Sequence, residues 1–208
     1  MQEYKNRFKN VTIGYLMIFG SFMLIGYNYF GELKERVFSD MNLQVYNIDK
    51  NVLQLNTNDI EEKQEEKKEE EKIDSYYIGT LEISKINLSK GFVNPDSLDN
   101  TVSKNLEIVK TSDMPDKKHG NFILAAHSGT SYISYFRDLY KLVVGDIATI
   151  KYKGVIYTYK IRKIYLQDKT GTIGIYRNMN KTTLTLVTCT QDDDYHQTIY
   201  IAELIGKN

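Results

Sequence analysis

One stretch of twenty residues, 11–30, contains no charged side chain and constrains this chain more than any other feature. As a helix rising about 1.5 Å per residue, it would span about 30 Å, the hydrocarbon thickness of a bilayer. Its hydrophobicity on every side does not suit the core of a chain of 208 residues. The segment therefore predicts a transmembrane anchor.

A cleaved signal peptide is the alternative interpretation, because Lys5, Arg7 and Lys9 precede the apolar stretch. The stretch is longer than a usual signal-peptide core, however, and no small-x-small cleavage pattern follows it before Glu32. We therefore favour an uncleaved anchor. The basic tail, residues 1–10, places the N-terminus in the cytoplasm and everything after the anchor outside the membrane.

Residues 31–74 differ in composition from both of their neighbours. The part up to about Leu55 mixes apolar and polar positions and could be helical, whereas residues 61–72 read EEKQEEKKEEEK without one apolar side chain. Such a run is usually a solvated helix or a disordered spacer. We expect it to hold the next domain away from the membrane surface.

A second domain, residues 75–208, shows short alternating segments with turn residues between them. These segments predict strands over residues 76–83, 106–110, 121–127, 146–152, 155–166, 183–189 and 198–204. Lys153-Gly154 is a plausible two-residue hairpin turn, and residues 96–103 and 133–142 resemble short helices. Seven or eight strands with few helices predict a mainly β domain, a closed or nearly closed barrel.

The overall composition gives little support to two classes of function. Lys and Arg number 27 and Asp and Glu also number 27, so the basic excess of a nucleic-acid-binding protein is missing. One cysteine and three histidines leave little material for a transition-metal cluster. We expect neither nucleic acid nor a metal or other cofactor as a partner.

The only cysteine, Cys189, ends the apolar run LTLVTC. A lone cysteine at a strand end is more often a small buried hydrophobe than a nucleophile. Outside the cell, however, a stray thiol invites oxidation. Strand alternation places Thr185, Val187 and Cys189 on one face, with the thiol at the last position beside a polar loop, within reach of a substrate.

A nucleophilic cysteine needs a nearby histidine or another cation to favour the thiolate. His127 ends the strand NFILAAH and is the best placed of the three histidines. His119 lies in the polar turn DKKHGN and is expected to be a solvated surface residue. His196 follows Cys189 in an acidic loop, which is a poor platform for a base.

These motifs resemble those of sortases, the membrane-anchored cysteine transpeptidases of Gram-positive bacterial surfaces. TLVTC (185–189) matches the family's Thr-Leu-x-Thr-Cys signature, and AAHSG (125–129) resembles its histidine motif. YFRDLYKLVVGD (135–146) resembles its Phe-x-x-Leu…Gly-Asp stretch. The similarity covers roughly residues 76–206, with the elements in the family's order.

The resemblance implies an eight-stranded barrel with a substrate groove that ends at Cys189. It also implies that Cys189 attacks a sorting signal of the Leu-Pro-x-Thr-Gly kind in surface proteins or pilins and forms a thioacyl enzyme. An amine of a peptidoglycan precursor or of a pilin then resolves it, with His127 as acid and base. Thr188 and Ser128, beside these two residues, are expected to line the groove.

One position departs from the family's pattern. The family has an arginine five positions before an alanine in the last strand, where it supports the substrate and the developing oxyanion. Counting back from Ala202 gives Gln197, whose amide can donate hydrogen bonds but carries no charge. The missing charge could cost about 2–4 kcal/mol of transition-state stabilisation. Arg177 is a candidate replacement; His196 is a poor one, because strand neighbours point to opposite faces.

Two alternative functions stay open at this point, and so does the role of the acidic triplet. Gln197 favours a sortase-fold protein with weakened catalysis that binds sorting tails or assists pilus or surface-protein assembly. The pairing of Cys189 with His127 also fits a secreted cysteine peptidase, which would hydrolyse its substrate whether or not an amine is added. The acidic triplet 192–194 is expected to be a solvated turn, or else to attract a cationic amine acceptor.

Overall fold

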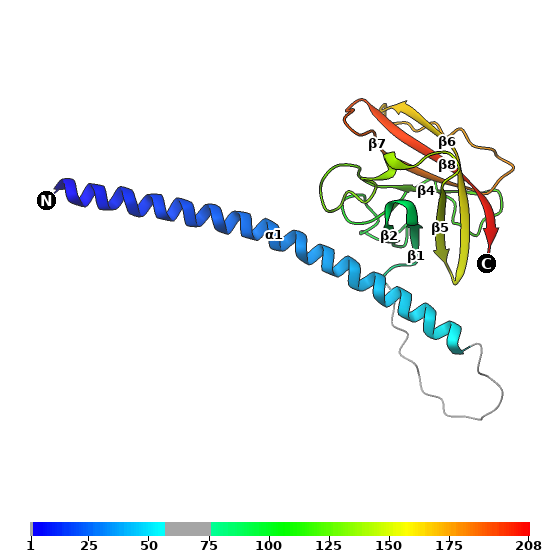
Figure 1. The fold of residues 1–208 in the computed structure, drawn as a ribbon, viewed down its shortest axis with the longest axis horizontal. Helices are drawn as coiled ribbons and strands as arrows, with labels where there is room; N and C mark the ends of the chain where they lie inside the picture. Colours follow the sequence, from blue (N-terminus) through cyan, green and yellow to red (C-terminus); the bar gives the residue numbers. More distant parts are fainter. Residues whose placement is uncertain (1, 57–75) are drawn as a thin grey trace, which may run out of the picture. The chain divides into compact units, whose positions relative to one another are not determined.

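The computed structural model describes residues 2–56 and 76–208 of the chain, and the charge run at residues 61–72 lies outside them. The chain divides into two compact units, Met1–Asp40 and Met41–Asn208. Helix α1 (Gln2–Asn56) makes up the described part of the first unit and continues into the second (Figure 1). Its segment Thr12–Asn47 is long and apolar enough to cross a membrane, which makes it a candidate anchor.

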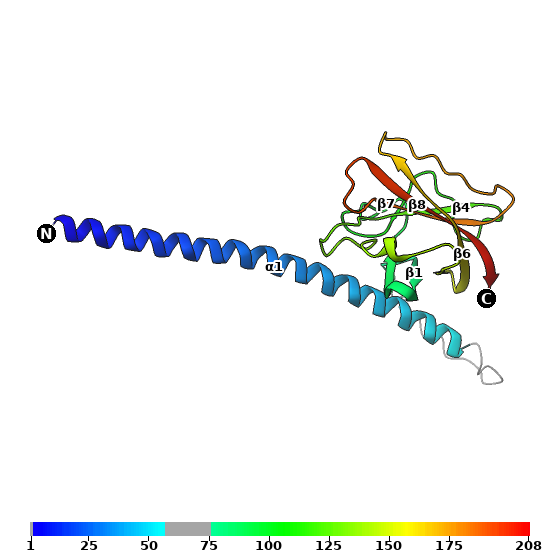
Figure 2. The same ribbon diagram turned by 45° about the horizontal axis from the view of Figure 1, so that its top comes forward.

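The second unit is one eight-stranded sheet that curls into a nearly closed barrel, as the sequence predicts (Figures 1 and 2). In spatial order the sheet runs β2-β1-β5-β6-β8-β7-β4-β3, and no ladder among the described residues joins β2 to β3. The strands are β1 (Gly79–Ile83), β2 (Leu88–Phe92), β3 (Glu107–Ile108), β4 (Asn121–Ala125), β5 (Ile147–Tyr152), β6 (Val155–Asp168), β7 (Thr183–Cys189) and β8 (His196–Lys207).

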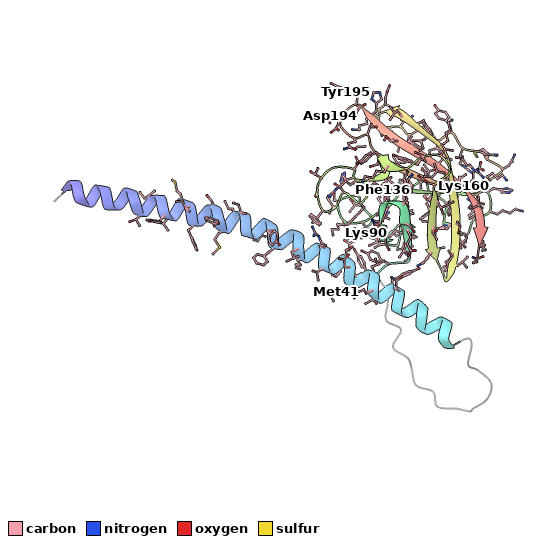
Figure 3. The ribbon with its side chains drawn as sticks, in the orientation of Figure 1. Met41, Lys90, Phe136, Lys160, Asp194 and Tyr195 are labelled. Atoms are coloured by element: carbon pink, nitrogen blue, oxygen red, sulfur yellow. The ribbon has the colours of Figure 1, made fainter. Side chains whose placement is uncertain are left out.

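Strand alternation explains how the barrel fills its interior. Every second residue of a strand faces inward, and these positions carry large apolar side chains that exclude water. Phe136 joins them from the loop after β4 (Figure 3). The inward residues of the three strands that matter most below are Phe122 and Leu124 of β4, Leu184 and Leu186 of β7, and Tyr200 and Ala202 of β8.

The hairpin turn predicted at Lys153-Gly154 is confirmed. Tyr152 pairs with Val155, so β5 and β6 are joined by two residues only. Lys153 and Gly154 have φ angles of 50° and 77°, the positive values that a two-residue type I′ turn requires at both positions. Glycine adopts such an angle without steric cost.

The two predicted short helices, in contrast, are wrong. Residues 96–103 form turns, because side chains bind the backbone donors that a helix needs: Asp96 N–H donates to Asn94 Oδ1 and Asp99 N–H to Ser97 Oγ. In residues 133–142 only the 3₁₀ helix η2 (Leu139–Lys141) forms. A second 3₁₀ helix, η1 (Ser84–Ile86), joins β1 to β2.

Part of the predicted spacer belongs to the second unit. Tyr46 of α1 is buried together with Tyr77 and Val93, and its hydroxyl donates to the carbonyl of Lys151 at 3.3 Å. The sequence predicts a separate stalk here, because apolar positions alone do not show which surface they contact.

Candidate active site

The register of four neighbouring strands brings the predicted site residues into one row. Cys189, the last residue of β7, pairs with Gln197 of β8, and Gln197 pairs with Gln167 of β6 on its other side. On the far side of β7, Ala125 of β4 runs parallel to it and pairs with Val187. The chain stays beside β7 just after β4, since Ala126 N–H donates to Val187 O, so His127 follows next to the end of β7 that carries Cys189.

This row lies on the face of the sheet opposite the apolar core. Leu184 and Leu186 face the core, so alternation turns Cys189 away from it. Ala126 likewise faces the core, which turns its neighbour His127 to the side of Cys189. Cys189 is exposed, and His127 and Gln197 are partly exposed, so a substrate can approach all three.

Three hydrogen bonds tie the histidine segment to the end of β7. Ala126 N–H donates to Val187 O at 3.3 Å, the Thr188 hydroxyl donates to Ala126 O at 2.9 Å, and the Ser128 hydroxyl donates to Cys189 O at 2.7 Å. The bonds lie on both sides of His127 and fix its backbone beside Cys189. Thr188 is buried, so its hydroxyl serves this tie, and its predicted place in the groove stays a prediction.

The loop after His127 is held from its other end. His127 O accepts a hydrogen bond from Phe136 N–H at 2.9 Å, and Phe136 is fully buried. The Arg137 guanidinium donates to the carbonyls of Gly129, Thr130 and Ser131. These contacts fix the loop at its far end.

The three side chains expected to react have no hydrogen-bond or ion-pair partner among the described residues. Within residues 2–56 and 76–208, no hydrogen bond or ion pair joins the Cys189 thiol, the His127 ring or the Gln197 amide to another group. Adjacent strands lie about 4.8 Å apart, which puts the thiol and imidazole side chains within reach of one acyl group between them. In ligand-free sites such bonds often form only once substrate is bound.

Arg177 does not replace the missing arginine. Its guanidinium donates to His119 O at 3.1 Å, to Lys181 O at 3.2 Å and to Thr183 Oγ1 at 3.4 Å. Thr183 begins β7 and Cys189 ends it, so the arginine sits about 20 Å from the thiol, at about 3.3 Å per residue. The charge of Arg177 stabilises the opposite end of the strand.

The His196 side chain is held by two carboxylates, although the sequence predicts that it lies in an acidic loop. It is the first residue of β8, and its ring nitrogens lie 2.6 Å from Asp193 Oδ2 and 3.1 Å from Asp168 Oδ1. A ring held in this way is not free to act as a base. His119 is exposed, as predicted, and it adopts a φ of 58° in its turn.

The acidic triplet is a turn in which the carboxylate of the middle residue, Asp193, is engaged in hydrogen bonds. Asp192 has a φ of 54°, and Asp193 Oδ1 accepts the N–H groups of Tyr195 and His196. The Tyr195 N–H, followed by the His196 ring, holds the pKa of Asp193 below its usual value. Asp194 and Tyr195 project from the tip of this loop (Figure 3). The triplet therefore offers an amine at most two unengaged carboxylates.

Two residues beside the row were missed in the sequence. Gln167 Oε1 accepts the N–H of Gly174 at 2.9 Å and so anchors the β6–β7 loop next to Gln197. Asp168 follows it and binds His196. No local pattern singles out either residue, because both acquire their place from the pairing of β6 with β8, more than 25 residues later in the chain.

Comparison with known proteins places these features in a family. A model of the sortase domain matches residues 81–205. The chain resembles a solved Clostridium perfringens sortase D5 transpeptidase with 31% identity and a TM-score of 0.53, over 62% of this chain and 79% of that one. A sortase C1 from Streptococcus agalactiae is 26% identical with a TM-score of 0.57, over 64% and 70%.

A third solved structure supports the fold alone. A lid mutant of sortase A from Corynebacterium diphtheriae is 20% identical to this chain, with a TM-score of 0.56, over 62% of this chain and 70% of that one. A search of the curated proteins gave no match. The similar structures carry four sortase class letters between them, A, C, D and E, so the class of this chain is not assigned.

Proposed function

Because the chain belongs to the sortase family, we propose that it cleaves a C-terminal sorting signal of the Leu-Pro-x-Thr-Gly kind and transfers the cleaved protein to an amine acceptor in the cell wall. Sortases are in general cysteine transpeptidases, and this chain has one cysteine, Cys189. Its acceptor would be an amine of a peptidoglycan precursor or of a pilin.

The observation that carries the proposal is the row formed by His127, Cys189 and Gln197. A thiolate at Cys189 attacks the scissile carbonyl, and the Gln197 amide on the next strand donates to the oxyanion. His127 on the other side protonates the leaving amine. The C–N bond breaks, and the acyl group stays on sulfur as a thioester.

The second half of the reaction uses the same groups in reverse. An incoming amine attacks the thioester carbonyl and gives its proton to His127 as the new C–N bond forms. The C–S bond breaks, and the thiolate returns to Cys189. A thioester keeps the acyl group reactive, so capture by an amine exceeds hydrolysis when the site orients the amine.

The location that we propose follows from the N-terminal segment. Residues 11–30 lie largely within the helical segment that is long and apolar enough to span a bilayer. Lys5, Arg7 and Lys9 precede it, which favours a cytoplasmic N-terminus and an extracellular barrel. Surface proteins or pilins with a sorting signal would then meet the enzyme outside the cell.

Mass spectrometry tests the proposal directly. The full chain in detergent micelles is mixed with a set of sorting-signal peptides, first without and then with an added amine. We expect a thioacyl adduct on Cys189 that disappears as a new amide product forms. Failure of every peptide to give an adduct, or an adduct that persists in Cys189→Ala, refutes the proposal.

The dependence on amine separates transpeptidation from a secreted cysteine peptidase. A peptidase releases the hydrolysed peptide at a rate that an added amine does not change. For the enzyme proposed here, the amide product increases with amine concentration at the expense of hydrolysis. The ratio of the two products at several amine concentrations decides between them.

Gln197 favours a second candidate function, a sortase-fold protein with weakened catalysis that assists assembly. Gln197→Arg distinguishes the two functions. A large gain in turnover would identify a weakened site, whereas no gain or a loss would identify a site adapted to glutamine. Gln197→Ala should lower kcat about 100-fold if the amide donates to the oxyanion.

A further inference from the structure

The ring of His196 lies between two carboxylates at the start of β8. Nδ1 is 2.6 Å from Asp193 Oδ2, and Nε2 is 3.1 Å from Asp168 Oδ1. An ionised carboxylate only accepts hydrogen bonds, so Nδ1 donates to Asp193 Oδ2 when it carries a proton. The contact of Nε2 with Asp168 Oδ1 is an ion pair when the ring is charged.

This ring joins three separate segments. Asp168 is the last residue of β6, Asp193 lies in the β7–β8 loop, and His196 is the first residue of β8. The backbone adds to the junction, since Lys169 N–H donates to Tyr195 O at 2.8 Å. One side chain thus holds together the end of β6, the beginning of β8 and the β7–β8 loop beside Cys189.

The residue after this junction is Gln197, which lies opposite Cys189. We propose that His196 is a positioning residue for Gln197, because its hydrogen bond to Asp193 and its ion-pair contact with Asp168 keep the start of β8 level with the thiol. The role rests on the function proposed above. Strand ends are the parts of a sheet that open most easily, so Gln197 depends on what fastens the strand there.

The absence of a guanidinium makes this placement more important. A charge stabilises an oxyanion over some distance, whereas a neutral amide does so only when its N–H group is aimed at the oxygen. A displacement of about 1 Å can cost about 100-fold in rate. In this chain a fixed strand end compensates in part for the weaker donor at Gln197.

The test uses the full chain in detergent micelles and the rate of thioester formation with a sorting-signal peptide. We expect His196→Ala to lower the acylation kcat about tenfold, with KM within about twofold. Asp168→Asn should lower kcat about threefold, and adding it to His196→Ala should change nothing further. Asp194→Asn, which removes the same charge nearby without touching the ring, is the matched control and should leave kcat unchanged.

Rescue by a conservative variant separates positioning from a purely structural role. His196→Gln, whose side-chain amide can still donate a hydrogen bond, should recover part of the kcat that His196→Ala loses. A structural role alone would lower the melting temperature and leave kcat per titrated thiol unchanged. If His196→Ala does not fold, Asp168→Asn carries the test, since 77% of that side chain is exposed.

The outcomes distinguish the two proposals. A wild-type chain that forms no thioester overturns the proposed function and the positioning role with it. A wild-type chain that reacts, with His196→Ala and Asp168→Asn reacting at the same kcat, overturns the positioning role alone.

Discussion

The two ends of β7 carry similar polar side chains but differ in how these groups are bonded. At the first end the hydroxyls of Thr183 and Thr185 donate to Asn121 Oδ1 at 2.9 and 2.8 Å, and Arg177 binds there as well. At the last end the Cys189 thiol, like the His127 ring beside it, has no bond to any other described group.

This difference separates stability from chemistry along one strand. Buried polar groups that lose their partners cost about 1–3 kcal/mol each, so the first end contributes to folding. Exposed groups without protein partners are satisfied by water and contribute little to folding. They stay available for a substrate, and only their backbone is fixed, by the bonds of Thr188 and Ser128.

The largest effect is expected from Cys189→Ala. Without the thiol no thioester forms, and acyl transfer should fall by about 10⁴-fold or more. The side chain is exposed, so the melting temperature should stay within about 2 °C of the wild type. Thioester formation and thermal unfolding are measured on the same preparation. A large loss of stability would contradict the view that this end of β7 contributes only chemistry.

His127→Gln comes next. Glutamine keeps hydrogen-bonding capacity but cannot carry a proton from one group to another, so kcat should fall by about 10³-fold. The backbone bonds of Ala126, Ser128 and Phe136 that hold this segment do not involve the ring and should persist. Steady-state kinetics test this result, and His119→Gln, in an exposed turn, serves as the control. Equal losses in the two variants would exclude His127 from the mechanism.

The first end of β7 should respond in the opposite way. Asn121→Ala removes the acceptor of two fully buried hydroxyls, those of Thr183 and Thr185. The free energy of unfolding should fall by about 3 kcal/mol, which lowers the melting temperature by about 6–12 °C. At a temperature where the variant is folded, kcat should stay within about twofold. A matching loss of kcat would show that the two ends are coupled.

Local patterns in the sequence account for much of the fold and for the choice of Cys189 and His127. Alternation predicts seven of the eight strands and places the thiol on the face away from the core. It fails for β2, because Ser89, Lys90 and Gly91 interrupt the apolar pattern. Gly91 is explained only by a distant residue: a Cβ atom there would lie 2.3 Å from the ring of Tyr77.

Contacts between distant segments account for what the sequence did not predict. Asn121 acts as a shared acceptor because β4 pairs with β7 in parallel, and Gln167 and Asp168 reach the row because β6 pairs with β8. Register of this kind is set by packing over the whole sheet, not by neighbouring residues. The position of Gln197 opposite Cys189 is the exception, since the family's spacing indicates it.

The smallest effect concerns acid stability at the first end of β7. A hydrogen bond from Lys117, followed by the N–H of Asn121 at 3.0 Å, holds the pKa of Asp113 below its ordinary value of 3.8. A carboxylate with a lowered pKa in the folded state contributes stability above pH 3.8, and this contribution is lost as the pH falls through the lower folded value. Urea unfolding at a series of acidic pH values should therefore give a shallower decline in Asp113→Asn than in the wild type. Asp116→Asn, an exposed neighbour whose Lys153 partner lies 3.1 Å away, is the control and should keep the wild-type slope. Parallel curves for Asp113→Asn and the wild type would mean that this carboxylate does not contribute to the bonded end of β7.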